Sequence, residues 1–521
     1  MSHDRRDFFG CLAGILAAGP ILAATTSEGT MVGRDRKFYE KRAESLASNL
    51  SRQVPSAITN GDETLYPSYF ACYSKALLHQ PNGEVDVQAY REFLDAIKKR
   101  NFAALEKIQL GGRGKLVNPL GCGILQNESA DPRDFFLSPP PTFSSLEQAA
   151  ELIELFWAAL CRDIPFAAYE TESLCTSAAA ELSRFENFQQ TKPLTLFRGS
   201  SVGDLIGPYV SQFLARDVPY GHGVIKQQYP APAGGKDFAT SYYPWLALQN
   251  GRLSQVSTYY SEESRYISNG RRLAEFVRKD FSYQAFLNAA LILLSFGQDA
   301  LSPNNPYRRS IAQQGFVSHG GPDILCLVAK AATYALNVSW YQKWAVHRRL
   351  RPEEFAGRVE SYLNRGATYP IPDPLGSSEA LERIHTETRS YLLPQAYPEG
   401  CPFHPSYPSG HAMIAGACVS VLKAYFDETF IFPNPRIASD DGRELLAYVG
   451  DLNVGDELNK LASNIAFGRN IAGIHWRSDA IAGLLLGEEV AIELLRETGS
   501  SYAEGKGVIS FNRFNGQPVT T

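Results

Sequence analysis

Apolar residues recur at helical spacing along most of the chain, and no strand pattern of any length interrupts them. Side chains at i, i+3 and i+4 share one face of a helix, so this spacing predicts a mainly α-helical fold. The predicted helices cover residues 34–53, 85–99, 145–163, 164–190, 203–216, 245–250, 268–280, 283–297, 324–350, 353–365 and 377–393, and a last one begins at residues 409–411 and continues through the apolar run 414–426.

Segments rich in glycine and proline separate the predicted helices. The longest, residues 111–141, contains a Pro139–Pro141 run and is typical of a surface loop. No repeat of fixed period is present, and 521 residues with a 44% hydrophobic share are enough for a large core. We therefore expect residues 25–521 to form a single mainly helical domain, with its chemistry concentrated in residues 340–480.

The segment Cys401–Ala412 reads CPFHPSYPSGHA and leads into the last predicted helix. Pro408 prevents that helix from extending backward, Ser409 offers an N-cap hydroxyl, and Gly410 lets a ligand approach the backbone. Because the first N–H groups of a helix are free and its dipole is positive there, this start is suited to an anion. His411 adds a group that exchanges protons near neutral pH. An ordinary capped helix is the alternative.

A run of cations lies in residues 340–352. Lys343, His347 and Arg351 are spaced by four residues, so one helix would align them on a stripe. Like charges at this spacing cost about 0.2 to 0.5 kcal/mol per pair, and a bound anion would remove that cost. The alternative is that these cations simply favour the C-terminus of a helix that ends at Pro352.

A second basic segment follows the central helix. Arg469 and His475 are six residues apart and would point in different directions on an unbroken helix, so we expect a break near Gly473 to bring them together. Asp479 lies one turn beyond His475, where its carboxylate would hold the imidazole tautomer. The alternative is a helix corner with an exposed arginine and a satisfied histidine.

The three segments together resemble the vanadium-dependent haloperoxidases and the related type 2 phosphatidic acid phosphatases. The shared pattern is a lysine followed by Arg-Pro, then Pro-Ser-Gly-His, then arginine, histidine and aspartate at the spacing of Arg469, His475 and Asp479. Gly468 stands where serine usually precedes the last arginine, and seven residues rather than six separate Lys343 from Arg351. Both departures, and His404, resemble the bromoperoxidases of marine algae and cyanobacteria, and the similarity covers most of the chain from about residue 39.

This resemblance implies two four-helix bundles and a vanadate cofactor. It implies that His475 bonds to the metal and that His411 is the acid–base catalyst, with Lys343 also polarising the bound peroxide. It places the vanadate oxygens against Lys343, Arg351, Ser409, Gly410 and Arg469. Trp340 and His404 are expected to line the halide approach, with His404 counted among the catalytic residues, and core packing is the alternative for both.

The implied activity is oxidation of bromide, and also of iodide, by hydrogen peroxide to a hypohalous acid equivalent that halogenates a small organic acceptor. Two alternatives remain open. An exported acid phosphatase could use the same cage, since phosphate and vanadate share shape and charge, with His475 as nucleophile. A non-catalytic oxyanion-binding protein is the third, although simple binding requires no acid–base histidine. The algal relatives form assemblies, so a homo-oligomer is expected.

The net charge and the N-terminal sequence indicate which partners the protein has and where it is located. A net charge of −5 and a pI near 6.1 argue against nucleic acid as the main partner. No apolar run of 18 residues occurs after the N-terminus, and the best candidate, residues 286–296, is too short to span a bilayer. Arg5-Arg6 followed by a small apolar run to Ala24 is typical of a twin-arginine export signal, which predicts a periplasmic or extracellular protein.

The cysteines form no metal-binding pattern. Eight are present, and removal of residues 1–24 would leave seven with no Cys-x-x-Cys pair. One or two disulfides are compatible with an oxidising compartment, whereas Cys418 is expected to be a buried thiol.

Overall fold

The computed structural model describes residues 43–45, 47–48, 51–52, 56–124, 131–254, 256–504 and 509–521. The expected export signal at residues 1–24 and most of the predicted helix at 34–53 lie outside these residues. The chain divides into two units, Met1–Arg52 and Gln53–Thr521, and every candidate site residue belongs to the second unit.

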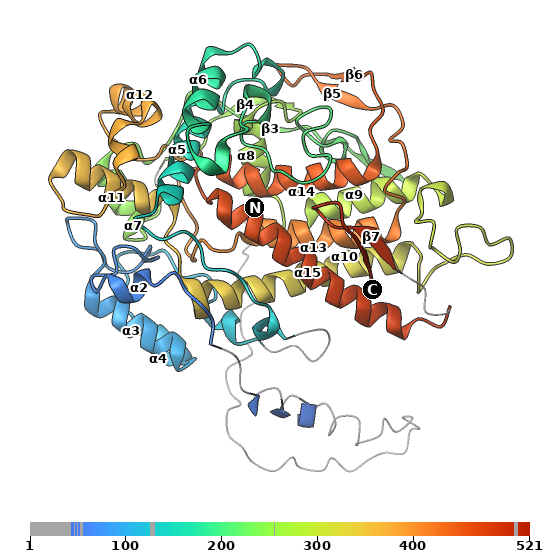
Figure 1. Cartoon of the computed structure of the whole chain (residues 1–521), viewed down its shortest axis with the longest axis horizontal. Coiled ribbons are helices and arrows are strands. Elements are labelled where there is room, and N and C mark those ends of the chain that lie inside the picture. The colour runs from blue at the N-terminus through green and yellow to red at the C-terminus, as the bar shows by residue number, and fades with distance from the viewer. Residues whose placement is uncertain are drawn as a thin grey trace, which may run out of the picture. The chain divides into compact units, whose positions relative to one another are not determined.

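Helices dominate the second unit, which confirms the predicted mainly helical fold (Figure 1). They are α2 Asp62–Leu65, α3 Val87–Lys98, α4 Phe102–Leu105, α5 Leu146–Cys161, α6 Ser173–Leu182, α7 Tyr242–Gln249, α8 Gly270–Lys279, α9 Gln284–Ser295, α10 Gly321–Trp340, α11 Pro352–Arg365, α12 Glu379–Thr388, α13 Gly410–Tyr425, α14 Val454–Ile471 and α15 Arg477–Ser501.

The strands are short and pair only as antiparallel two-stranded sheets in the described residues. β1 Val218–Tyr220 pairs with β2 Gly223–Ile225, β3 Tyr229–Pro232 with β4 Tyr260–Arg265, β5 Arg436–Ala438 with β6 Leu445–Ala447, and β7 Ser510–Asn512 with β8 Pro518–Thr520. In the β3–β4 pair the register shifts between Pro230 and Pro232. These strands are too short to leave a readable alternation in the sequence.

Helix α13 is the centre of the bundle that carries the site. It packs against α10, α14 and α15, and Figure 1 shows α10, α13 and α15 running alongside one another. Every residue of α13 except His411 is buried. A Cβ atom on Gly416 would lie 2.1 Å from the Leu484 carbonyl oxygen, so α13 and α15 meet almost backbone to backbone.

Two of the predicted helices are wrong. Residues 203–216 are mostly turns, because Gly203 and Gly207 have positive φ and the amides of Ser211 and Gln212 donate to side chains of α14. Residues 164–190 are interrupted, and only α6 is an α-helix there, flanked by the single 3₁₀ turns 166–168 and 186–188.

The helix predicted at residues 324–350 also differs. α10 ends at Trp340, a π-helix follows over Tyr341–His347, and Arg348 has a φ of 40° that stops the helix. Lys343, His347 and Arg351 therefore do not share a helical stripe. His347 instead packs its ring edge-on against Tyr407, with ring centroids 4.9 Å apart.

One helical stretch, Gly321–His347, is long and apolar enough by length and composition alone to cross a membrane, so the shorter residues 286–296 are not the strongest candidate. Half of its most apolar window is buried inside the protein. The core helix of a soluble bundle has the same character, and this stretch supplies Lys343 to the interior.

The seven cysteines from Cys72 to Cys418 are all free thiols, so no disulfide forms in the part of the chain that the structure describes. Cys418 is buried in α13, as predicted, and its thiol donates to the Val328 carbonyl oxygen at 3.4 Å.

Candidate active site

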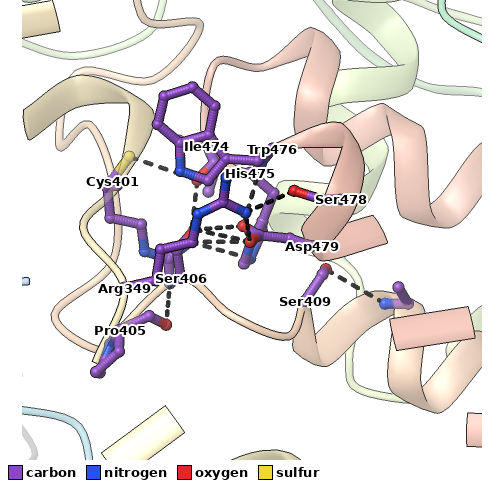
Figure 2. A network of polar contacts seen from close by, with 12 residues as sticks. Arg349, Cys401, Pro405, Ser406, Ser409, Ile474, His475, Trp476, Ser478 and Asp479 are labelled. Atoms are coloured by element: carbon purple, nitrogen blue, oxygen red, sulfur yellow. Dashed lines mark hydrogen bonds and ion pairs between the residues drawn. The ribbon is translucent and has the colours of Figure 1, made fainter. Parts of the chain in front are cut away.

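The predicted helix start is confirmed at Ser409, which caps α13. Its hydroxyl oxygen accepts a hydrogen bond from the Ala412 amide at 3.4 Å, and its own amide donates to the Asp479 carbonyl oxygen at 3.0 Å (Figure 2). The hydroxyl proton of Ser409 therefore remains available to a ligand. Gly410 begins the helix, where the first N–H groups lack intrahelical partners.

Lys343 projects from the π-helix into the interior and is fully buried. Its ammonium donates to the carbonyl oxygens of Pro405 and Ser406, at 2.9 and 2.7 Å. Burial, and after it the charge of Arg351, hold the pKa of Lys343 well below its ordinary value. Two of the three ammonium protons are used by carbonyls, so one remains for a ligand.

Arg351 stands at the N-cap of α11 and reaches two histidines. Its Nη1 donates to His475 Nε2 and its Nη2 to His404 Nδ1, each at 2.9 Å. Its backbone amide donates to Glu354 at 2.7 Å, which fixes the residue at the helix start. Lys343 and Arg351 are thus brought together because the chain turns between the π-helix and α11. They do not lie on one continuous helix.

His475 lies between α14 and α15, after the break that the sequence predicts. α14 ends at Ile471, and Gly473 adopts a φ of +83°, a conformation that favours glycine. His475 Nδ1 donates to Asp479 Oδ2 at 2.8 Å, since a carboxylate only accepts. Nε2 is therefore the unprotonated nitrogen, and it is the atom that the Arg351 guanidinium faces.

Arg349 holds the other oxygen of Asp479, and sequence reasoning missed it. Figure 2 shows Arg349 beside Asp479 and Ser478; its Nη1 lies 2.8 Å from Asp479 Oδ1. A second carboxylate, Glu151 of α5, lies 3.3 Å from the same guanidinium. Ser406 also donates to Asp479. Arg349 gave no sequence signal of its own, because it is one of three arginines within residues 348–351.

Arg469 approaches from the last turn of α14. Its Nη1 donates to the Val277 carbonyl oxygen at 3.0 Å, and its guanidinium lies 5.5 Å from the centroid of the Tyr397 ring. Its Nε is buried and has no hydrogen-bond partner. The guanidinium therefore keeps donors that the protein does not use.

The three cations Lys343, Arg351 and Arg469 share one electrostatic environment. Burial, followed by the charges of Arg351, Lys343 and Arg469 in that order, holds the pKa of His475 well below its ordinary value. Among the described residues, no carboxylate oxygen lies within 4 Å of the charged side-chain nitrogens of Lys343, Arg351 or Arg469. Buried charges without a counter-ion are costly, so this donor set fits a compact, multiply charged oxyanion such as vanadate.

His411 faces the same region from the first turn of α13 and also contributes to lowering the pKa of His475. Its Nε2 lies 3.2 Å from Asp280 Oδ1, and its side chain is 28% exposed, so a small reactant can reach it. Asp280 is the C-cap of α8 and was not predicted as a site residue. It lies 131 positions away from His411, and no local motif marks it.

His404 and Trp340 lie side by side, with ring centroids 5.0 Å apart. The Trp340 indole N–H donates to the Val117 carbonyl oxygen at 3.3 Å, which orients the ring. Burial, and next the charge of Arg351, lower the pKa of His404 well below its ordinary value, so its imidazole is neutral. The structure thus brings together all ten predicted site residues, and of the predicted cationic stripe only His347 lies apart.

The bundle and its cation-lined interior define a helical protein with a buried oxyanion-binding site. A family model described as the VCPO second helical-bundle domain matches residues 323–504. A vanadium-dependent bromoperoxidase of Ascophyllum nodosum is 34% identical over 498 residues, which cover 89% of this chain and 87% of that protein. One of Corallina officinalis is 31% identical over 575 residues, covering 90% and 96%. The chain belongs to the vanadium-dependent bromoperoxidase family.

A solved structure supports the same relationship. The homohexameric second vanadate-dependent bromoperoxidase of A. nodosum superimposes with a TM-score of 0.87 at 28% identity, over 97% of this chain and 94% of that one. The similarity therefore covers the whole second unit rather than the site alone.

Proposed function

We propose that this protein is a vanadate-dependent bromoperoxidase, which oxidises bromide and iodide with hydrogen peroxide. The observation that carries the proposal is the set of three buried cations without a counter-ion, with the imidazoles of His475 and His411 close enough to affect one another electrostatically. Bound vanadate supplies a Lewis-acidic centre that makes peroxide electrophilic toward halide. The overall reaction converts bromide, hydrogen peroxide and a proton into hypobromous acid and water.

The residues that would hold the cofactor follow from their donors. Lys343, Arg469 and the Ser409 hydroxyl each keep a donor that no protein atom uses, and they would direct it at oxygens of the anion. The Arg351 guanidinium donates to His475, His404 and backbone carbonyl oxygens, so it would direct at the anion the N–H groups that face the two imidazoles. His475 offers Nε2 as the ligand nitrogen, because Asp479 holds the proton on Nδ1. Arg349 in turn holds Asp479, so the ligand histidine is oriented through two successive buried contacts.

His411 is the proton-transfer group. Its ring is partly exposed and stands at the first turn of α13, where it can take a proton from peroxide and return it to the oxygen that leaves as water. Asp280 holds the ring through Nε2 and fixes its direction. Bromide gives two electrons to the peroxide O–O bond, which breaks as the Br–O bond forms. Lys343 stabilises the charge that develops on the departing oxygen.

The test is halide oxidation by purified protein stripped of oxyanions. Bromination of monochlorodimedone and formation of triiodide are measured with peroxide, with and without added orthovanadate, beside hydrolysis of p-nitrophenyl phosphate without vanadate. Vanadate-dependent halide oxidation is expected. Phosphate-ester hydrolysis without any vanadate-dependent halide oxidation would favour the phosphatase alternative, and neither activity would favour a simple oxyanion-binding protein.

We also propose that the protein is exported and forms a homo-oligomer. The arginine pair and apolar run within residues 1–24 support export, and the homohexameric relative supports assembly. Cell fractionation with a variant in which Arg5 and Arg6 are both lysine tests the first, since a twin-arginine route should fail. Light scattering of the purified protein tests the second.

A further inference from the structure

A mostly apolar cavity lies next to the proton-transfer pair of the site. Its volume is about 410 Å³, within the range of small-molecule pockets. Its walls include Tyr229 and Tyr260 of the β3–β4 pair and Phe276 of α8, with Ile267 between these elements. The Tyr229 and Phe276 rings meet edge to face with centroids 5.0 Å apart, so a packed aromatic pair forms part of the wall.

Asp280 joins this cavity to the site. It lines the cavity, and its Oδ1 is the atom 3.2 Å from His411 Nε2. Burial, and after it the Asp280 carboxylate, raises the pKa of Tyr229, which shows that the tyrosine lies close to the same carboxylate. A molecule in the cavity would therefore be separated from the proton-transfer histidine His411 by the Asp280 side chain alone.

The charges around the cavity favour an anion. Glu275 already accepts from the Tyr260 hydroxyl at 2.6 Å and from Arg278 at 3.2 Å, and Asp280 is engaged by His411. Three cations line the cavity: Arg265, which is paired with Glu263, and also Arg272 and Lys279. In the part of the chain that the structure describes, neither Arg272 nor Lys279 has a carboxylate within 4 Å, and Lys279 is exposed.

We propose that this cavity binds the organic acceptor, and that the acceptor is an electron-rich aromatic ring carrying an anionic substituent such as a carboxylate. This inference rests on the proposed bromoperoxidase activity. The ring packs against Tyr229, Phe276 and Tyr260, and the anionic group pairs with Arg272 and Lys279. Hypobromous acid from the site then brominates the ring: a C–Br bond forms, the Br–O bond breaks, and the ring carbon loses its proton, which leaves with hydroxide as water.

A competition experiment tests the inference. The enzyme with vanadate, bromide and peroxide receives an equimolar mixture of 6-hydroxy-2-naphthoate and neutral 2-naphthol, and the ratio of brominated products is compared with that from reagent hypobromous acid. Capture in the cavity should favour the naphthoate at least threefold more than the reagent does, a difference of about 0.7 kcal/mol that one solvent-exposed charge pair can supply.

Matched variants separate the cavity from the chemistry. Lys279→Gln removes the cation at the last residue of α8, and Lys98→Gln removes an exposed cation at the last residue of α3, far from the cavity in sequence. Lys279→Gln should move the product ratio toward the reagent value, Lys98→Gln should not, and both should form triiodide at the wild-type rate.

The two hypotheses fail in different ways. Normal triiodide formation with a wild-type product ratio equal to that of the reagent would overturn the cavity assignment alone. An equal change of the ratio in both lysine variants would overturn it too. Absence of vanadate-dependent triiodide formation would overturn the proposed function, and this inference with it.

Discussion

The chemistry of the site depends on cationic side chains that are buried without a carboxylate to neutralise them. Lys343 and Arg351 are fully buried, and their neighbours are carbonyl oxygens and imidazoles rather than carboxylates. Leaving a buried charge unpaired costs about 3 to 5 kcal/mol, so the protein without its anion carries a strained group of like charges. Asp479, a buried carboxylate that acts electrostatically on Lys343 and Arg351, is already used by Arg349 and His475. The affinity of the site for an oxyanion follows from this arrangement.

The contact between Asp280 and His411 can be tested by one substitution: Asp280→Asn should weaken catalysis without removing the cofactor. The amide keeps a similar shape but loses the charge that holds the His411 ring, so we expect kcat for triiodide formation to fall roughly tenfold. His411→Ala should lose about 100-fold or more and sets the lower limit. Vanadate affinity should not fall in Asp280→Asn, because Asp280 contacts the histidine and none of the three cations. An unchanged kcat would show that Asp280 does not position His411.

The helix ends around the site could be predicted where the residues that determine them lie next to one another in the sequence. The start of α13 at Ser409 and the break at Gly473 follow from cap and glycine chemistry, and the structure confirms both. The π-helix at Tyr341–His347 was not predictable, because seven residues are too few to reveal a changed apolar period. Asp280 was missed for a different reason: its contact with His411 is tertiary, and a single sequence carries no record of it.

The close contact between α13 and α15 gives a prediction at the scale of elements. A Cβ atom on Gly487 would lie 2.2 Å from the Met413 carbonyl oxygen and 2.9 Å from the Ala417 amide. Both contacts are with backbone, so Gly487→Ala must push the helices apart, and we expect it to lower the free energy of unfolding by about 1 to 3 kcal/mol. Urea unfolding followed by circular dichroism measures this.

Gly376→Ala is the matched control for that substitution, since no atom lies within 4 Å of the added Cβ and Gly376 does not have a positive φ. It should be close to neutral. Equal stability of the two variants would contradict the close backbone packing of α13 against α15.

For the whole molecule, stability should depend on pH through Glu151, which is buried beside Arg349. Burial raises its pKa from an ordinary 4.5 to about 7, while the Arg349 charge opposes the shift. Between these two values the folded protein holds a proton that the unfolded chain has released. Its stability should therefore fall as pH rises from about 4.5 to 7 and level off above that, by a contribution on the order of 3 kcal/mol at most.

Glu151→Gln isolates this contribution. Urea titration at several pH values gives the free energy of unfolding of both proteins. The value for wild type minus the value for the variant should decrease as pH rises through this window. A difference that stays constant between pH 4.5 and 7 would mean that Glu151 is ionised throughout, held so by Arg349 and Ser478.

Isothermal titration calorimetry of vanadate into the oxyanion-free protein tests directly whether Lys343, Arg351 and Arg469 surround one anion. We expect one vanadate per chain, competition by phosphate, and a loss of at least tenfold in affinity in Arg469→Ala, which removes one of the three unpaired cations without touching the ligand histidine. Binding of no vanadate, or binding that Arg469→Ala leaves unchanged, would show that these cations do not surround a single anion.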